Sequence, residues 1–282
     1  FALFASNYNI RYNNSTQIKT IQTRFLPTKG VTTSFDLISL ATTGTNPHDV
    51  IIGISQSIDT SQLGSGSLAH LIVASGSLAD SSADRVAAIS SSLLGPIFNG
   101  DVWNLSVRLN SSSAEGNTVE AFATNTSFNK NTYILSASLE VPKFFSGSGE
   151  DHDICTLILG SRTPIGASET AGALLNPFTG SVQEFRVWNE KLTKDTIFSQ
   201  SLSPFNYNGN NISSSYDSLL LRVPLGSDNN TIIATNNAPN PILSAPALGT
   251  ISETHLSETH HLTTPDTVGK SMVSDKVRLD TG

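Results

Sequence analysis

The stretch that decides the fold is PFTGSVQEFRVWNEKL, residues Pro177 to Leu192. It opens on a turn signal, Thr179-Gly180, and then alternates apolar with polar residues as far as Trp188. Such alternation places successive side chains on opposite faces and is typical of a strand with one buried face. After Trp188 the alternation stops at a polar cluster, so the strand ends there.

The residues that follow this strand carry helix signals. In LTKDTIFSQSL, residues Leu192–Leu202, Thr193 can cap the first turn and Asp195 lies within that turn, where it complements the helix dipole. Pro204 ends the segment. The sequence therefore predicts a strand that runs directly into a short helix, in a chain with few other helix signals.

Short strand patterns recur on both sides of this stretch. One of them, DVWNLSVRLNSS, places Trp103, Leu105, Val107 and Leu109 on one face. The segment Ser82–Gly95 is compatible with a helix that ends at glycine, but we prefer a strand because β patterns flank it closely. The predicted strands lie within Thr33–Thr42, Val50–Ile58, Ser67–Ser77, Arg85–Ser90, Asp101–Ser112, Thr118–Thr124, Thr132–Val141, Ile154–Ser161 and Ser181–Asn189. Short strands separated by turn signals predict a β-sandwich or barrel.

The composition favours the same class. Charged residues are 14% of the 282-residue chain, well below the ~25% of ordinary soluble domains. Polarity comes from 41 Ser, 29 Thr and 23 Asn, which favour turns and strand surfaces over helix interiors. The net charge of −7 and the absence of any Lys/Arg run argue against a nucleic-acid partner.

The single cysteine, Cys155, cannot form a disulfide within the chain, and its strand-like surroundings predict a buried, inert thiol. No stretch approaches the ~18–20 consecutive apolar residues that span a bilayer, so no membrane span is expected. The chain begins at Phe1 without a signal-peptide pattern, as a processed product or a fragment would.

Three segments in this order resemble the laminin-G or concanavalin-A-like lectin/glucanase family: Asp101–Asn125, Ile154–Ser161 and Phe178–Gln200. The resemblance covers roughly residues 33–202 and rests chiefly on Trp103 and on the run that ends at Trp188. It implies an all-β fold, a two-sheet antiparallel jelly-roll sandwich. It further implies that Trp188 closes the sandwich and that the short helix caps one open end.

A second resemblance lies downstream. Residues 203–228 and 261–282 are similar to segments of virion structural proteins from marine tailed phages and other aquatic viruses. In those proteins a laminin-G-like module is followed by linkers and further structural regions. The resemblance implies that the chain is located in a virion or on an extracellular surface.

The sequence predicts three regions: an N-terminal segment (1–30), the jelly roll (31–227), and an extended arm or linker to a further region (228–282). The arm lacks sustained periodicity and contains prolines at 239, 241, 246 and 265, which fix an extended path. Ordering so long an arm costs about 1–2 kcal/mol per residue, with little core to offset it. We therefore expect it to lie against other chains and not to fold back onto the jelly roll.

Two clusters contain residue types that bind metals. SETHLSETHH gathers Glu253, His255, Glu258, His260 and His261, which suit zinc or nickel. In an extended strand, however, these side chains divide between opposite faces, so a solvated or interface-contacting arm is the preferred interpretation. GEDHD, residues 149–153, offers hard oxygen ligands for calcium, but a polar turn is the preferred interpretation. The sequence therefore predicts neither a cofactor nor a metal site. Calcium binding is the one possibility that the sequence leaves open.

Enzyme signatures are absent from the sequence. The glucanases of this fold carry a Glu-x-Asp-x-x-Glu strand, and this chain has no such spacing. VGKS at residues 268–271 lacks the earlier glycine that a phosphate loop needs, since that position is Thr264. We expect no hydrolysis of polysaccharides, because no carboxylate pair has the required spacing.

Two function classes remain. The first is a non-catalytic structural component of a virus particle or surface assembly, with other copies or other structural proteins as partners. The second is a glycan-binding, lectin-like adhesion module that contacts surface glycans. Such sites use aromatic faces with Asn and Asp hydrogen bonds, and both tryptophans here are predicted inside strands.

Overall fold

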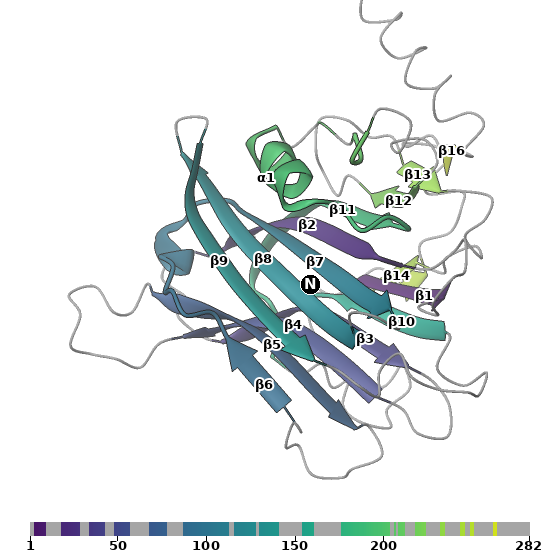
Figure 1. The fold of residues 1–282 in the computed structure, drawn as a ribbon, viewed down its shortest axis with the longest axis horizontal. Coiled ribbons are helices and arrows are strands. Elements are labelled where there is room, and N and C mark those ends of the chain that lie inside the picture. The colour runs from purple at the N-terminus through teal and green to yellow at the C-terminus, as the bar shows by residue number, and fades with distance from the viewer. Residues whose placement is uncertain are drawn as a thin grey trace, which may run out of the picture.

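In the computed structural model the chain is an all-β, two-sheet antiparallel jelly-roll sandwich, as the sequence predicts (Figure 1). The described residues are 3–9, 18–28, 34–42, 48–56, 68–77, 87–112, 116–127, 130–140, 154–160, 176–203, 206, 208–211, 218–223 and four short strands between 232 and 263. Only one pair of described strands, β13 with β16, is parallel.

The first sheet has eight strands in the order β15-β14-β1-β10-β3-β4-β5-β6. Their bounds are β15 (Gly249–Thr250), β14 (Leu243–Ala245), β1 (Leu3–Asn9), β10 (Ile154–Leu159), β3 (Phe35–Thr42), β4 (His48–Gln56), β5 (Ala69–Ser77) and β6 (Ala87–Ser90). The strand β6 confirms the choice of strand over helix for that segment.

The second sheet also has eight strands, in the order β16-β13-β12-β11-β2-β7-β8-β9. Their bounds are β16 (Leu262–Thr263), β13 (Ile232–Ala234), β12 (Leu219–Val223), β11 (Gly180–Trp188), β2 (Thr20–Pro27), β7 (Trp103–Ser112), β8 (Gly116–Ser127) and β9 (Lys130–Glu140). In Figure 1, β7, β8 and β9 lie in front of the first sheet, with α1 (Lys194–Leu202) at the top.

The core lies between the two sheets. The predicted inward face of β7, which carries Trp103, Leu105, Val107 and Leu109, is fully buried. A group of edge-to-face aromatic rings fills one end of the core, and it comprises Phe25, Phe35, Phe98 and Phe178. Phe98 comes from a single 3-10 turn, Ile97–Asn99, between β6 and β7.

A break in the alternation of β3 corresponds to a structural irregularity. By strict alternation, Phe35 and Leu37 would lie on one face of the strand, whereas Ile38 and Leu40 would lie on the other. The pairing of β3 with β4 shifts register between Asp36 and Ile38, and both Leu37 and Ile38 are fully buried. A bulge of this kind allows two successive apolar residues to reach the core.

The place of Trp188 differs from the prediction. Phe185 and Val187 of β11 face the core, so Trp188 faces outward and is buried beneath α1 with Leu192. The prediction that Trp188 closes the sandwich is therefore wrong, and the helix covers the outer face of the second sheet rather than an open end. This explains why the strand continues directly into a helix, because the outward tryptophan needs a cover.

The N-terminal segment predicted as residues 1–30 contributes two strands to the sheets. Strand β1 pairs with β10 and β14, and β2 lies between β11 and β7 near the middle of the second sheet. The sandwich therefore begins before residue 31. Polar residues at alternate positions of β2, Gln22 and Arg24, weaken the apolar pattern that marks the other strands.

The arm predicted for residues 228–282 is described only at β13, β14, β15 and β16. These short strands add to the outer edges of both sheets, next to β12 and β1. At these positions the prediction that the arm does not fold back onto the jelly roll is wrong. The physical reason is that an edge strand presents unpaired backbone groups, and even a three-residue strand satisfies some of them.

Candidate functional site

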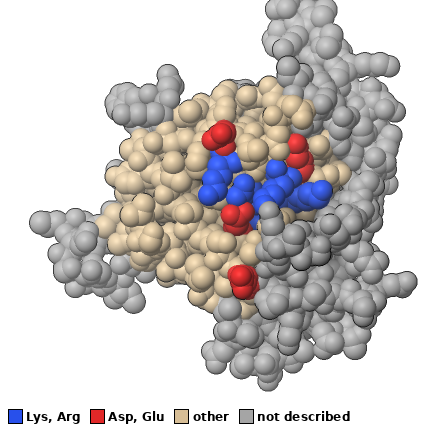
Figure 2. All heavy atoms as spheres, viewed as in Figure 1, with Lys and Arg blue, Asp and Glu red and all other residues tan. Residues whose placement is uncertain are grey.

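The outer face of the second sheet carries rows of polar side chains. In the register of β2, β7 and β8, Arg24 lies opposite Asn104, which lies opposite Thr124. One step along the strands, Gln22 lies opposite Ser106, whose hydroxyl accepts a hydrogen bond from the Gln22 amide at 3.2 Å. The charged side chains visible on this face gather near its middle, with basic and acidic groups adjacent (Figure 2). The face is therefore a polar layer on top of an apolar core.

A bulge in β11 places a carboxylate on this face. The pairing with β2 shifts register between Gln183 and Arg186, and Glu184 takes a left-handed backbone conformation with φ of 52°. For a residue other than glycine this conformation is costly, and it persists where surrounding contacts impose it. The bulge brings Glu184 and Arg186 onto the same outer face.

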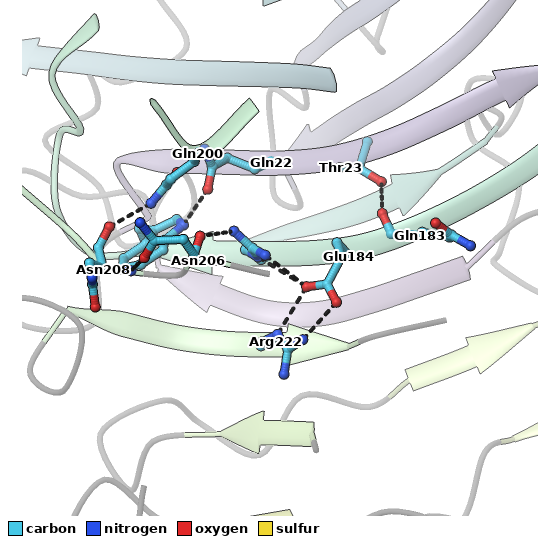
Figure 3. Close-up of polar contacts among 10 residues, drawn as sticks. Gln22, Thr23, Gln183, Glu184, Gln200, Asn206, Asn208 and Arg222 are labelled. Atoms are coloured by element: carbon cyan, nitrogen blue, oxygen red, sulfur yellow. Dashed lines mark hydrogen bonds and ion pairs between the residues drawn. The ribbon is translucent and has the colours of Figure 1, made fainter. Parts of the chain in front are cut away.

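Glu184, Arg186 and Arg222 form a buried ion cluster (Figure 3). Arg222 of β12 donates two hydrogen bonds to the carboxylate, from Nη2 to Oε1 at 2.6 Å and from Nε to Oε2 at 2.9 Å. Arg186 donates from Nε and Nη2 to Oε2 at 3.2 and 2.9 Å. The same guanidinium also donates to the backbone oxygen of Asn206 at 3.1 Å. One carboxylate thus holds two arginines from adjacent strands.

The surroundings shift the pKa of two of the charged groups. Burial alone would raise the pKa of Glu184, but Arg186 and Arg222 outweigh it and hold that pKa below its ordinary value. Burial lowers the pKa of Arg24, and the nearby Glu184 offsets part of this effect. Glu184 is therefore the anion that keeps this cluster ionised in the folded protein.

Helix α1 covers one half of the polar layer. It begins as predicted, since Thr193 Oγ1 accepts a hydrogen bond from the backbone N–H of Thr196. Its buried face carries Ile197 and also Gln200, so the contact between helix and sheet is partly polar. Gln22 donates to Gln200 Oε1 at 2.6 Å and accepts from the Trp188 indole N–H at 2.8 Å. Figure 3 shows the bond between Gln22 and Gln200. Together these bonds hold the helix over the outward tryptophan.

Arg24 differs from Arg108, Arg186 and Arg222, whose guanidinium groups each donate a hydrogen bond to a carboxylate. The Nε of Arg24, like that of Arg108, is buried and has no hydrogen-bond partner among the described residues. Two small hollows border the Arg24 side chain. The volume in which the centre of a water molecule can lie is about 20 Å³ in one and about 50 Å³ in the other. The smaller lies towards α1, between Asn104, Ser106 and Gln200. The larger lies on the side away from α1, and it is lined by Arg24, Phe25, Leu26, Val102, Ser181 and Gln183.

A separate feature is an apolar edge of the sandwich. Strands β6 and β9 end their respective sheets and lie near each other. Four of the five exposed large hydrophobic residues in the described part of the chain belong to these strands or to the loop after β6. They are Ile89 (41% exposed), Leu93 (62%), Tyr133 (41%) and Ile134 (39%). Single exposed apolar residues are ordinary, but a group along one edge marks a contact surface.

The metal-binding candidates from the sequence, residues 149–153 and the histidine cluster 253–261, lie outside the described residues. Within the described ranges, no group of three or more His, Cys, Asp or Glu side chains could hold a metal ion. Cys155 lies on β10, as its strand pattern predicts. The possibility of calcium therefore stays a prediction.

Sequence reasoning missed the polar layer. Its signal was present, because Arg24, Glu184, Arg186 and Arg222 are charged residues inside strands of a chain that is only 14% charged. What the sequence could not show is that β2, β11 and β12 are neighbours, since about 150 residues separate β2 from β11.

In the part of the chain that the structure describes, no helix is long and apolar enough to cross a membrane. A scan against protein-family models finds no match. A search of curated proteins also finds no match.

The search of solved structures finds similar chains at low identity. One is a heptameric SAP-like pentraxin from Limulus polyphemus, with TM-score 0.43, 16% identity, and coverage of 74% of this chain and 76% of that chain. Another is the Ruminococcus gnavus IT-sialidase CBM40, with TM-score 0.40, 13% identity, and coverage of 70% and 94%. A third is the LG1-3 region of the laminin alpha2 chain, with TM-score 0.37, 11% identity, and coverage of 66% and 29%. At these values the similarities carry no argument about ligand or site.

Proposed function

We propose that this chain is a non-catalytic structural component of a surface assembly or virus particle and that it joins a second copy of itself through the β9 edge. The observation that carries the proposal is the group of exposed apolar residues along the adjacent edges β6 and β9. These residues lose contact with water when the edge is covered, and burial of apolar surface stabilises most protein–protein contacts.

Strand β9 has only part of the protection that edge strands usually have, because its one irregularity, a bulge between Asn131 and Tyr133, lies near its beginning. Natural edges carry charges, prolines or bulges that discourage pairing with another chain. The nine residues between Lys130 and Glu140, NTYILSASL, contain no charge and no proline. Six side chains along the strand, namely Thr132, Tyr133, Ile134, Ser136, Ser138 and Glu140, are exposed. The outer backbone groups of β9 are thus available to pair with another strand.

The sequence of β9 favours a second copy as the partner. If two β9 strands pair in an antiparallel manner about a twofold axis at Leu135, the regular stretch 133–137 of one copy lies opposite the same stretch of the other. This stretch carries no charge, so no like charges face each other across the pairing, an arrangement that would be unfavourable. Isologous contacts of this kind are the commonest in homo-oligomers. The second sheet of one copy would then continue into the second sheet of the other.

The test is sedimentation velocity on the wild type, Ile134→Lys and Ser199→Lys. Lysine at position 134 places a charge on the apolar edge, whereas Ser199 is exposed on α1 and serves as the matched control. We expect wild type and Ser199→Lys to sediment as dimers or larger species and Ile134→Lys as a monomer with an unchanged melting temperature. Equal sedimentation of all three proteins would contradict pairing through this edge.

The virus-particle setting rests on the resemblance of residues 203–228 and 261–282 to virion proteins. An extracellular or virion location agrees with the low charge and hydroxyl-rich composition. Other structural proteins of the assembly are the further partners we propose. The absence of polysaccharide hydrolysis stays a prediction that a panel of glucans can test.

The alternative function is a glycan-binding module for attachment. A different observation supports it, namely that Arg24 has a buried nitrogen without a hydrogen-bond partner among the described residues and borders two small hollows. The two functions are compatible, because the β9 edge and the Arg24 hollow use different residues.

A further inference from the structure

We infer that Arg24 binds the oxyanion of an acidic saccharide, a carboxylate or sulfate group, in the hollow between β2, β11 and the residue before β7. The hollow is lined by Arg24, Leu26, Val102, Ser181 and Gln183, with Phe25 at its base. This inference goes beyond the assembly role and supplies a ligand class for the alternative function.

Charge is the first argument. Among the described residues, Arg24, Arg186 and Arg222 carry three positive charges around the carboxylate of Glu184, so these four side chains have a formal charge of three minus one, or +2. Glu184 is engaged by Arg186 and Arg222 through four hydrogen bonds. In a chain with a net charge of −7, this local excess of positive charge attracts anions to one place.

The second argument is the unmet hydrogen-bonding capacity of Arg24. A buried N–H without a partner costs about 1–3 kcal/mol, and its Nε is in this state. The residue as a whole is half-buried and lines the hollow, so a ligand bound there contacts the Arg24 side chain. Carboxylates and sulfates match the planar fork of arginine with two parallel hydrogen bonds.

The third argument is the lining of the hollow. About 50 Å³ is open to the centre of a water molecule, which is room for roughly three waters or for one oxyanion. Ser181 and Gln183 border the hollow with a hydroxyl and an amide, which can bond to sugar hydroxyls. Leu26 and Val102, both half-buried, form an apolar wall suited to the C–H face of a sugar ring. The size indicates that the oxyanion enters the hollow while the ring lies at its mouth.

The test is titration calorimetry, with amide chemical shifts of Ser181 and Gln183 as a second readout. The probes are glucuronate, glucose 6-sulfate, glucose and inorganic sulfate at one ionic strength. The proteins are wild type, Arg24→Gln, Arg24→Lys and Lys194→Gln. Lys194 is exposed on α1 and away from the hollow, so its variant removes one positive charge without changing the site.

We expect glucuronate and glucose 6-sulfate to bind the wild type and Lys194→Gln equally. Arg24→Gln should weaken this binding about tenfold or more, and Arg24→Lys should weaken it less. Which acidic sugar binds more tightly identifies carboxylate or sulfate as the preferred group. Glucose binding as tightly as glucuronate, equal losses in Arg24→Gln and Lys194→Gln, or no binding of either acidic sugar would overturn the inference. Sulfate binding as tightly as the sugars would overturn its saccharide part.

Binding and assembly can fail separately. If Ile134→Lys is monomeric and still binds the acidic sugars, both proposals stand. If the wild type is monomeric but binds them, the edge proposal fails and the Arg24 inference stands.

Discussion

Glu184→Gln is expected to reduce the free energy of unfolding by about 3–5 kcal/mol, because it removes the charge of a carboxylate that is paired with two buried arginines. Arg222 is fully buried, and its two hydrogen bonds go to different oxygens of the carboxylate. Glutamine keeps one acceptor oxygen, but its NH2 group cannot accept a hydrogen bond from an arginine at the other position. Glutamine has nearly the same volume, so packing changes little. Urea unfolding measured by intrinsic fluorescence gives the difference directly.

The matched control is Glu120→Gln. Glu120 pairs with Arg108 at 2.7 Å, but the carboxylate side chain is 22% exposed, compared with 1% for Glu184. Solvent screens a partly exposed pair, so we expect a loss of about 1 kcal/mol or less. Equal losses for the two variants would show that burial of the Glu184 cluster is unimportant.

The same cluster predicts that the free energy of unfolding decreases at acidic pH. The pKa of Glu184 is lower in the folded protein than the ordinary value of ~4.3 expected when unfolded. Its contribution is therefore complete above the unfolded pKa and is lost as pH falls through the folded pKa. Urea unfolding of the wild type at a series of pH values from neutral to acidic should show this loss. In Glu184→Gln the free energy of unfolding should depend less on pH over the same range.

Trp188→Ala is expected to cost about 3–5 kcal/mol, since it removes a fully buried indole from the interface between α1 and the second sheet. The cluster that it anchors contains Phe122, Leu192, Ile197 and Leu219. Loss of the indole also leaves the Gln22 carbonyl without its 2.8 Å donor. Chemical denaturation measures the loss, and hydrogen exchange should show α1 opening first.

Trp188→Phe separates packing from hydrogen bonding. Phenylalanine keeps most of the apolar contact but lacks the N–H group, so the expected loss is smaller, about 1–3 kcal/mol. If Trp188→Ala were as mild as Trp188→Phe, the tryptophan would not hold the helix against the sheet.

The strands and the sheet class could be predicted from the sequence because alternation of apolar residues is a local signal. The inward set of β7, with Trp103 as its first member, follows from that signal alone. The register shift in β3 coincides with the point where two successive apolar residues, Leu37 and Ile38, interrupt the alternation. Thr193 and Asp195 likewise marked the start of α1.

The face occupied by Trp188 and the polar layer could not be predicted in the same way. The bulge at Glu184 changes which side chains of β11 face outward, and the carboxylate that it presents is bonded to Arg222 on another strand. Alternation cannot distinguish a tryptophan in the core from one buried on the outer face by a helix. Such features depend on contacts between distant segments, whereas periodicity reports only on neighbours along the chain.

The measurement that tests self-pairing through β9 most directly is hydrogen exchange of residues 130–140 at two protein concentrations. Covering the edge gives its outward backbone N–H groups new partners, so we predict slower exchange there at the higher concentration and no change in β7. Ile134→Lys should abolish the difference. Exchange in residues 130–140 that is independent of concentration in the wild type would contradict the account.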